Sequence, residues 1–257
     1  GNTIYTIFNI STWLMIFMIL VPYALGLGNT IYSGGIGYKG FFYSNNELSV
    51  ALIILFYFSL YRLARKLGIT QIIQLGAIAV CVLLLNTKSG MAACLAGGGL
   101  FIVEYLFRRG AKFKSLVILM ILLVLYVAKD FIIEQVQGFM TRQTYLHGLY
   151  GGSLLDTILS GRTFKLQAAW EEMSAGSGFV FRFLFGNGFC SETLVEMDFI
   201  DIFFYLGFFA VVGLTGLLIW VFVASVKNFK KDGTLVRPVG FLVVIGFAFL
   251  AGHTFFM

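Results

Sequence analysis

The amino-acid sequence predicts an all-α integral membrane protein with about seven transmembrane helices and one large extracytoplasmic loop. Three features predict this class: the composition, a series of apolar runs and the distribution of cations. Of the 257 residues, 59% are apolar and only 12% are charged, and the mean hydropathy is +0.92. A soluble domain carries roughly 25% charged residues, so this chain has too few charges to cover a soluble core. The low counts of proline (2) and cysteine (3) argue against a disordered chain and a disulfide scaffold.

Seven apolar runs come close to the roughly 20 residues that a helix needs to cross the hydrocarbon core. They cover approximately residues 4–27, 47–63, 69–86, 91–107, 113–128, 202–226 and 238–257. The second and fifth runs are short, so snorkelling flanks or local thinning of the bilayer must help them to span. We therefore expect residues 1–257 to form a single transmembrane domain. Because the chain starts at Gly1 and the last run stops at Met257, we also expect a fragment of a longer membrane protein.

The cations alternate along the chain as the positive-inside rule requires. Eleven of the 18 cations fall in the turns after the second, fourth and sixth runs, opposed there only by Asp232. These eleven are Arg62, Arg65, Lys66, Arg108, Arg109, Lys112, Lys114, Lys227, Lys230, Lys231 and Arg237. The alternation predicts a cytoplasmic N-terminus. The basic pI of 9.2 therefore reports orientation in the lipid bilayer. It indicates no nucleic-acid partner, since no basic helix face carries stacking aromatic side chains.

Residues 129–201 form the long extracytoplasmic segment between the fifth and sixth runs, and they hold nine of the twelve acids. Structureless loops beyond about 15 residues are uncommon unless they are functional. The residues after Ser160, the expected N-cap, predict an amphipathic helix. Its apolar stripe at i, i+3, i+4 and i+7 consists of Leu166, Ala169, Trp170 and Met173. Arg162 lies one turn before this stripe, so it either binds a ligand or snorkels to lipid phosphates.

An aromatic segment bracketed by glycines, residues 176–189, is too short to span and predicts an interfacial or re-entrant piece. Four acids then precede or enter the sixth run: Glu192, Glu196, Asp198 and Asp201. Acids at the edge of a hydrocarbon segment are costly and indicate a functional site. The alternative is a solvated helix entrance, where the helix dipole favours negative charge.

Two further cations lie at the predicted outer boundary. Lys88 sits in the short turn at residues 86–90, where it either binds an anion or serves as an interfacial anchor, and Lys39 sits in the first outer loop. His147 and His253 are isolated, and no cysteine or histidine has metal-ligand spacing. We therefore expect no metal site and no cofactor.

Five short motifs occur along the chain in a characteristic order. They read G-Y-K-G-F-F-Y-S-N-N-E at residues 37–47, T-K-S-G at 87–90, S-G-R at 160–162, L-F-G-N-G-F at 184–189 and V-E-M-D-F-I-D at 195–201. Together they resemble the O-antigen ligase and polysaccharide polymerase (Wzy-like) family of bacteria, especially its Gram-positive capsule and exopolysaccharide polymerases. The resemblance implies a multi-pass glycosyltransferase of the plasma membrane with a GT-C-like fold. Its donor would be an undecaprenyl-diphosphate-linked oligosaccharide, used outside the cytoplasm without a metal or a nucleotide sugar.

The resemblance also implies roles for individual residues. In the ligase branch, a T-x-S-R turn and an arginine of the large loop contact the donor diphosphate. The corresponding cations here are Lys88 and Arg162, with Lys39 as a third candidate. The proposed base of the ligases is a histidine eleven residues before a glycine. Counting back from Gly207, that position holds Glu196, which favours a polymerase that uses a carboxylate, and Asp198 competes for the same role.

Three readings of the function stay open from the sequence. Polymerisation of lipid-linked repeat units into a cell-surface polysaccharide is the first, with other polysaccharide-assembly proteins as further partners. The second is ligase-type transfer of a glycan to an acceptor. The third is a transporter or flippase for the same lipid-linked glycan, although transporters of this kind usually carry paired discontinuous helices in a repeat, and the sequence shows no repeat. A fragment of such an enzyme could also be inactive alone.

Overall fold

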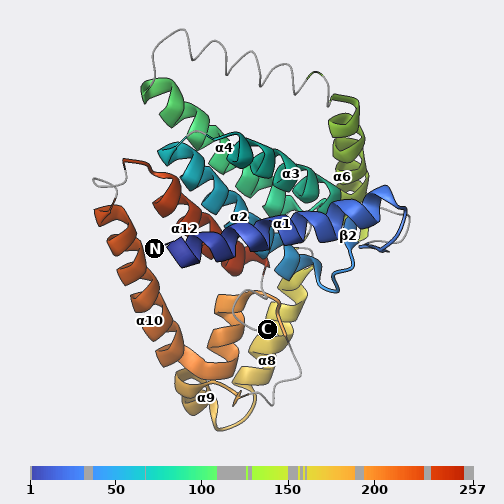
Figure 1. Ribbon diagram of the computed structural model, residues 1–257. Helices are drawn as coiled ribbons and strands as arrows, with labels where there is room; N and C mark the ends of the chain where they lie inside the picture. The colour runs from blue at the N-terminus through green and yellow to red at the C-terminus, as the bar shows by residue number, and fades with distance from the viewer. Residues whose placement is uncertain are drawn as a thin grey trace. The chain divides into compact units, whose positions relative to one another are not determined.

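The structure is a computed structural model of the chain. It describes residues 2–31, 37–66, 68–108, 129–149, 161–188, 194–228 and 233–251, together with residues 126, 156 and 159. The described part is mainly α-helical (Figure 1), and its one two-stranded sheet is short. The helices are α1 (Asn2–Ala24), α2 (Asn45–Arg65), α3 (Ile69–Leu85), α4 (Lys88–Arg108), α6 (Lys129–Leu149), α8 (Arg162–Ser174), α9 (Phe179–Phe185), α10 (Asp198–Lys227) and α12 (Val236–Ala251), and the strands are β1 (Asn29–Thr30) and β2 (Tyr38–Gly40).

Three of these helices, α1, α2 and α10, are long and apolar enough to cross a membrane, and α3 and α12 are shorter apolar helices. The structure therefore agrees with an all-α membrane protein. The predicted fifth run, residues 113–128, lies outside the described residues except for Tyr126. The chain divides into two compact units. The first comprises Gly1–Met140 and Asn228–Phe241, and the second comprises Thr141–Lys227 and Leu242–Met257.

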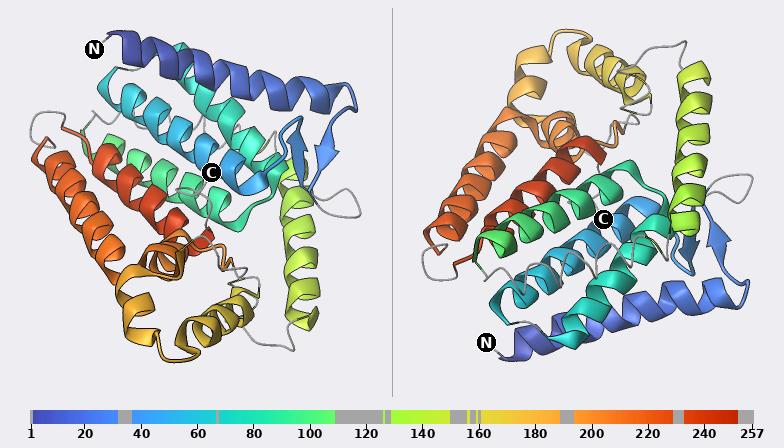
Figure 2. Two further views of the ribbon diagram at one scale, coloured as in Figure 1. Left: turned by 90° about the horizontal axis from the view of Figure 1, so that it is seen from below. Right: turned by 90° about the horizontal axis from the view of Figure 1, so that it is seen from above.

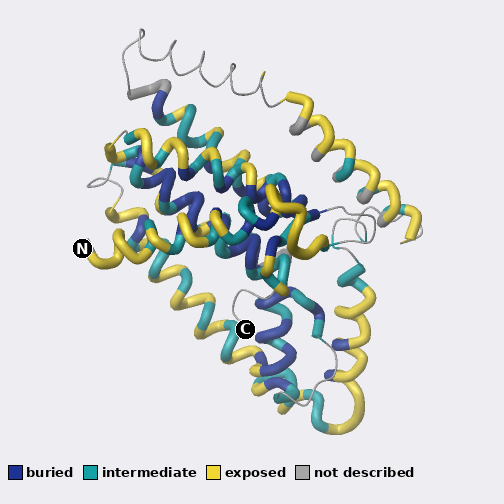
Figure 3. The backbone as a smooth tube through the Cα atoms, turned by 45° about the vertical axis from the view of Figure 1, so that its right-hand side comes forward, coloured by how far each residue is buried: buried dark blue, intermediate teal, exposed yellow. Residues whose placement is uncertain are grey.

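In the first unit, α2 is the central helix. It packs against both α3 and α4, which lie beside it in Figures 1 and 2, and it is buried along most of its length (Figure 3). Glycines allow its close approach to its neighbours. A Cβ atom at Gly97 of α4 would lie 2.8 Å from Cζ of Tyr57, and one at Gly240 would lie 2.6 Å from Cδ1 of the same ring. Gly97 of α4 and Gly240 of α12 therefore leave room for the Tyr57 ring of α2.

The T-K-S-G turn also has a packing role in the first unit. Asn86 ends α3 in the left-handed conformation (φ 55°), as residues at helix C-termini often do. The buried hydroxyls of Thr87 and Ser49 lie 2.9 Å apart in a hydrogen bond. A Cβ atom at Gly90 would lie 2.6 Å from Oγ1 of Thr87 and 3.0 Å from Oγ of Ser49 in α2. The glycine of the motif thus lets the start of α4 approach α2.

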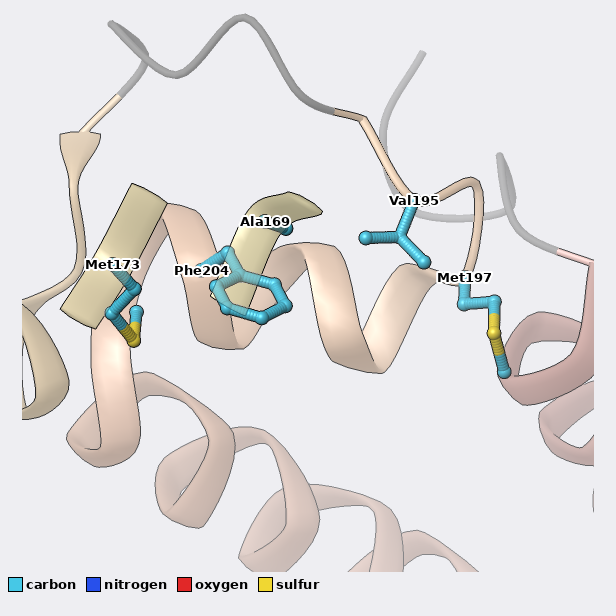
Figure 4. Packing of buried hydrophobic residues seen from close by; sticks show 5 residues of the cluster. All are labelled: Ala169, Met173, Val195, Met197 and Phe204. Carbon is cyan, nitrogen blue, oxygen red and sulfur yellow. The ribbon is translucent and has the colours of Figure 1, made fainter. Parts of the chain in front are cut away.

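In the second unit, α8, α9 and the start of α10 enclose a small core. Its buried members are Ala169, Met173, Val195, Met197 and Phe204 (Figure 4). The predicted helix is confirmed as α8, and of its apolar stripe Ala169 and Met173 are buried, whereas Leu166 and Trp170 are exposed. The expected N-cap was wrong by one residue. Gly161, not Ser160, precedes the helix, and its φ of 77° favours glycine at this position.

Helix α10 is broken at Gly207, whose φ of 80° and ψ of −177° are not helical. The break lets the chain cross α9 closely, since a Cβ atom at Gly207 would collide with the backbone of Leu184 and Phe185. Gly186 fits equally tightly against the backbone of Tyr205. Residues 208–227 that follow the break are about as long as the roughly 20 residues that a span requires, and large side chains such as Trp220 are exposed, as suits contact with lipid.

Replacing Gly207 by alanine tests the role of this break. The region at φ 80° and ψ −177° is almost restricted to glycine and costs another residue about 1–3 kcal/mol, and the new methyl group would also meet the backbone at Leu184. We expect Gly207→Ala to lower the melting temperature of the detergent-solubilised protein, followed by tryptophan fluorescence. The matched control is Gly213→Ala in the same helix, where a Cβ atom meets nothing within 4 Å. That control should be neutral or stabilising by up to about 1 kcal/mol, and equal melting temperatures for the two variants would contradict the assigned strain.

Candidate functional site

Two cations share one face at the start of α8. Arg162 and Lys165 are three residues apart and are therefore neighbours on the helix surface. The start of the helix is anchored by Asp156: its backbone carbonyl oxygen accepts a hydrogen bond of 2.9 Å from the Gly161 backbone N–H, and its carboxylate accepts one from the Thr163 hydroxyl. The two cations thus extend from an ordered helix start.

The segment before α10 lies against this face of α8. Val195 and Met197 belong to the same buried core as Ala169 and Met173 of α8 (Figure 4). Glu196, between them, pairs instead with the two cations. One carboxylate oxygen lies 2.5 Å from Nζ of Lys165, and the other lies 3.8 Å from Nη2 of Arg162. Burial of two alternating apolar side chains therefore places the carboxylate between them on the polar side of the same contact.

Asp201 holds this segment in place. Its carboxylate oxygens accept hydrogen bonds from the backbone N–H of Val195 at 2.8 Å and of Met197 at 2.9 Å. Glu196 lies between these two amides and has φ 66°, a left-handed conformation that is uncommon for a residue with a side chain. Asp201 is 1% exposed, so its charge is compensated by these charge-assisted bonds within the fold. Strained backbone of this kind persists where the surroundings enforce it, and it clusters at functional sites.

The two candidate bases differ in their access to a substrate. The side chain of Glu196 is 34% exposed, whereas Asp198, the first residue of α10, is 0% exposed. A base must come within hydrogen-bond reach of the proton that it removes. The exposure therefore favours Glu196 as the carboxylate that meets a substrate, while Asp198 lies inside the unit.

Arg182 of α9 has a structural role. Its Nε donates to the carbonyl oxygen of Met173 at 2.9 Å, and its Nη2 donates to the carbonyl oxygen of Ala175. These carbonyls belong to the C-terminal end of α8, whose partial negative charge favours a cation. Arg182 thus fastens α9 to the end of α8.

An apolar groove of about 880 Å³ opens beside the charged cluster in the second unit. Leu166 and Trp170 of α8 line one side of it, and both segments of α10 and the end of α12 line the rest. Leu166 follows Arg162 by one helical turn. The groove thus begins where the charged face of α8 ends, and its walls are apolar, with Thr215 among the few polar side chains.

Lys88 and Lys39 belong to the first unit. Lys88 is the first residue of α4 and directly follows the buried Thr87. The Lys39 ammonium donates to the carbonyl oxygen of Tyr43 at 2.7 Å and lies 5.7 Å from the centre of the same ring. Burial raises the pKa of the adjacent Tyr38 phenol, which donates a hydrogen bond to the carbonyl oxygen of Leu27. Lys39 is thus held by its own loop.

The structure therefore brings together two of the predicted site residues, Arg162 and Glu196, in one ion-paired cluster. Sequence reasoning missed Lys165 and the clamping role of Asp201. The spacing of three residues between Arg162 and Lys165 was a usable signal, because it places both cations on one helix face. Glu192 lies outside the described residues. Within the described part of the chain, no three His, Cys, Asp or Glu side chains gather where they could hold a metal ion.

Comparisons of the chain with protein-family models, curated proteins and solved structures find no match. The resemblance to the ligase and polymerase family therefore rests on short motifs alone.

Proposed function

We propose that this protein polymerises oligosaccharide units linked to undecaprenyl diphosphate, by glycosyl transfer at the outer face of the bacterial plasma membrane. The proposal includes the seven-span topology and the GT-C-like architecture that the sequence predicts. The observation that carries it is the cluster of Arg162, Lys165 and Glu196 beside an apolar groove. A polyprenyl diphosphate needs both features, because it joins a long apolar chain to a compact anion.

The two cations suit the diphosphate leaving group. The guanidinium of Arg162 can bind phosphate oxygens in a bidentate manner, and the ammonium of Lys165 adds a mobile point charge. The Lys165 side chain is 46% exposed and that of Arg162 13%, so the donor would meet a partly desolvated charge. Fixed cations stabilise the charge that develops on the diphosphate in the transition state.

Glu196 supplies the base in this proposal. The donor diphosphate would take its place as counter-ion of Arg162 and Lys165, which releases the carboxylate toward the acceptor sugar. The acceptor hydroxyl oxygen then attacks the anomeric carbon of the donor, the bond from that carbon to the diphosphate oxygen breaks, and the hydroxyl proton passes to Glu196. Undecaprenyl diphosphate leaves with the electron pair of the broken bond.

Reconstitution tests the proposed reaction against its alternatives. Purified protein in proteoliposomes should convert lipid-linked repeat units into longer lipid-linked chains. Movement of the intact donor across the bilayer without chain growth would instead indicate a flippase. Transfer of one unit to a different acceptor without chain growth would indicate a ligase.

Substitution of the two cations tests donor binding. We expect Arg162→Ala and Lys165→Ala each to weaken donor binding about tenfold or more, since a hydrogen bond to a charged group contributes about 1.5–3 kcal/mol. Arg162→Lys should not restore binding, because a point charge cannot reproduce bidentate contacts. The matched control is Lys129→Ala, an exposed cation on α6. Lys88→Ala and Lys39→Ala, assayed beside it, test whether the first unit contributes to the donor site. Unchanged donor affinity in both α8 variants would contradict the assignment.

A further inference from the structure

Three helices of the first unit surround a polar pocket of about 510 Å³. Three cations line it, Arg62 and Arg65 at the end of α2 and Lys66 directly after it. The rest of the lining consists of Tyr5, Tyr61, Gly68 and Gln71. The sequence explains these cations only as determinants of orientation. The structure adds that they converge on one cavity.

The cations are held in place around this pocket. Arg62 donates to Oδ1 of Asn9 at 3.0 Å, and the same oxygen accepts a bond of 2.7 Å from the buried Gln74. The Arg62 guanidinium also lies 5.8 Å from the centre of the Phe58 ring. An arginine fixed by two helices has lost much of its side-chain entropy before any ligand arrives, which favours binding.

Tyr61 contacts two guanidiniums at the same end of the unit, those of Arg65 and Arg237. Its hydroxyl accepts hydrogen bonds of 3.3 Å from both Arg65 and Arg237, and its ring faces both side chains, at 5.8 Å and 5.0 Å. Arg237 comes from the turn after the sixth run, so cations from two distant turns meet here. At this turn, Glu104 of α4 accepts hydrogen bonds from the Thr234 hydroxyl and the Leu235 backbone N–H. The surroundings of the pocket thus concentrate positive charge.

The position of the pocket at the ends of two long apolar helices indicates which kind of anion it binds. Arg65 is the last residue of α2, and Tyr5 and Asn9 lie near the start of α1, two helices that are long enough to cross a membrane. The ends of such helices lie at the level of the lipid phosphates. Tyrosine and arginine are the side chains expected at that level, and basic pockets between transmembrane helices bind anionic headgroups.

We propose that this pocket binds the phosphate of an anionic phospholipid headgroup. Arg62 and Arg65 contact the phosphate oxygens, and Lys66 contributes charge at the rim. The site lies in the first unit and uses none of the residues of the proposed glycosyl-transfer site, so either proposal can fail without the other.

The test measures lipid binding by native mass spectrometry of the purified, delipidated full chain. Titration with phosphatidylglycerol should give a retained lipid. Phosphatidylcholine with the same acyl chains has the same phosphate, but its choline cation cancels the net negative charge and is repelled by the three cations of the pocket. It should therefore bind at least about tenfold more weakly. Lys66→Glu reverses an exposed charge, so folding should be preserved, and it should remove this preference. Arg65→Lys keeps the charge but loses the planar fork, so it should retain only part of the preference.

The control is Lys227→Glu, which makes the same change of net charge at an exposed cation of the second unit. If Lys66→Glu and Lys227→Glu lose phosphatidylglycerol binding equally, a general surface potential attracts the lipid, and the proposal that the pocket binds it is overturned. A second experiment measures whether inorganic phosphate alone stabilises the lipid-free protein. If it stabilises the lipid-free wild type but not Lys66→Glu, the pocket takes a soluble anion and the lipid assignment is overturned. Equal retention of both lipids by the wild type would also overturn it.

Discussion

Glu196→Gln should bind the lipid-linked donor and yet make no polymer. Glutamine keeps the size and the hydrogen-bonding reach of glutamate but cannot take the acceptor proton. General-base catalysis typically contributes about 10²–10⁴-fold in rate, so we expect chain elongation in proteoliposomes to fall by that factor. Because Glu196 is the shared counter-ion of Lys165 and Arg162 in the donor-free protein, removal of its charge should leave donor affinity equal or higher.

This combination of lost elongation and retained binding separates a base from the alternatives. If Glu196 only positions the acceptor, activity should fall partly and recover at high acceptor concentration. Asp198→Asn, assayed in parallel, tests the competing carboxylate, and the exposed Glu134→Gln on α6 is the matched control. Full activity of Glu196→Gln would mean that its carboxylate merely compensates the charge of α8.

Asp201→Ala should have the largest effect on stability. The substitution leaves the backbone N–H groups of Val195 and Met197 without their acceptor in a buried setting. Each buried donor left unsatisfied costs about 1–3 kcal/mol, so we expect a loss of about 2–6 kcal/mol for the two. Thermal unfolding in detergent, followed by tryptophan fluorescence, measures the loss, with the exposed Asp130→Asn as control. An unchanged melting temperature of Asp201→Ala would contradict the clamp.

Asp201→Asn separates the positioning role from simple stability. Asparagine retains one acceptor oxygen but presents an amide group to the second backbone N–H, so the turn at Glu196 should relax from its left-handed conformation. We expect the elongation rate to fall while donor affinity, which depends on α8, stays within a few fold. A parallel fall of both would indicate general unfolding. Glu196→Gly should also have a free energy of unfolding about 1 kcal/mol higher than that of Glu196→Ala, because glycine accepts φ 66° without strain.

Much of the candidate site was predictable from local patterns. The apolar stripe of α8 follows from the helical period, and Arg162 was singled out because it precedes that stripe by one turn. Glu196 was selected through the resemblance, because it stands eleven residues before Gly207, where the ligase motif has a histidine. The physical reason for that glycine, a break in α10 against α9, involves segments that meet only in the folded unit.

The sequence by itself determined the class of this protein: apolar runs of spanning length, few charges, and an amphipathic helix within the long loop. These properties depend on the identity and periodicity of neighbouring residues, which local physical chemistry can evaluate. Only the tertiary structure decided that Lys165 pairs with Glu196, that Asp201 clamps the two amides around it, and that Arg62, Arg65 and Arg237 converge near one pocket. Such contacts join residues from different segments, and their energies depend on distances and burial that chain order alone does not set.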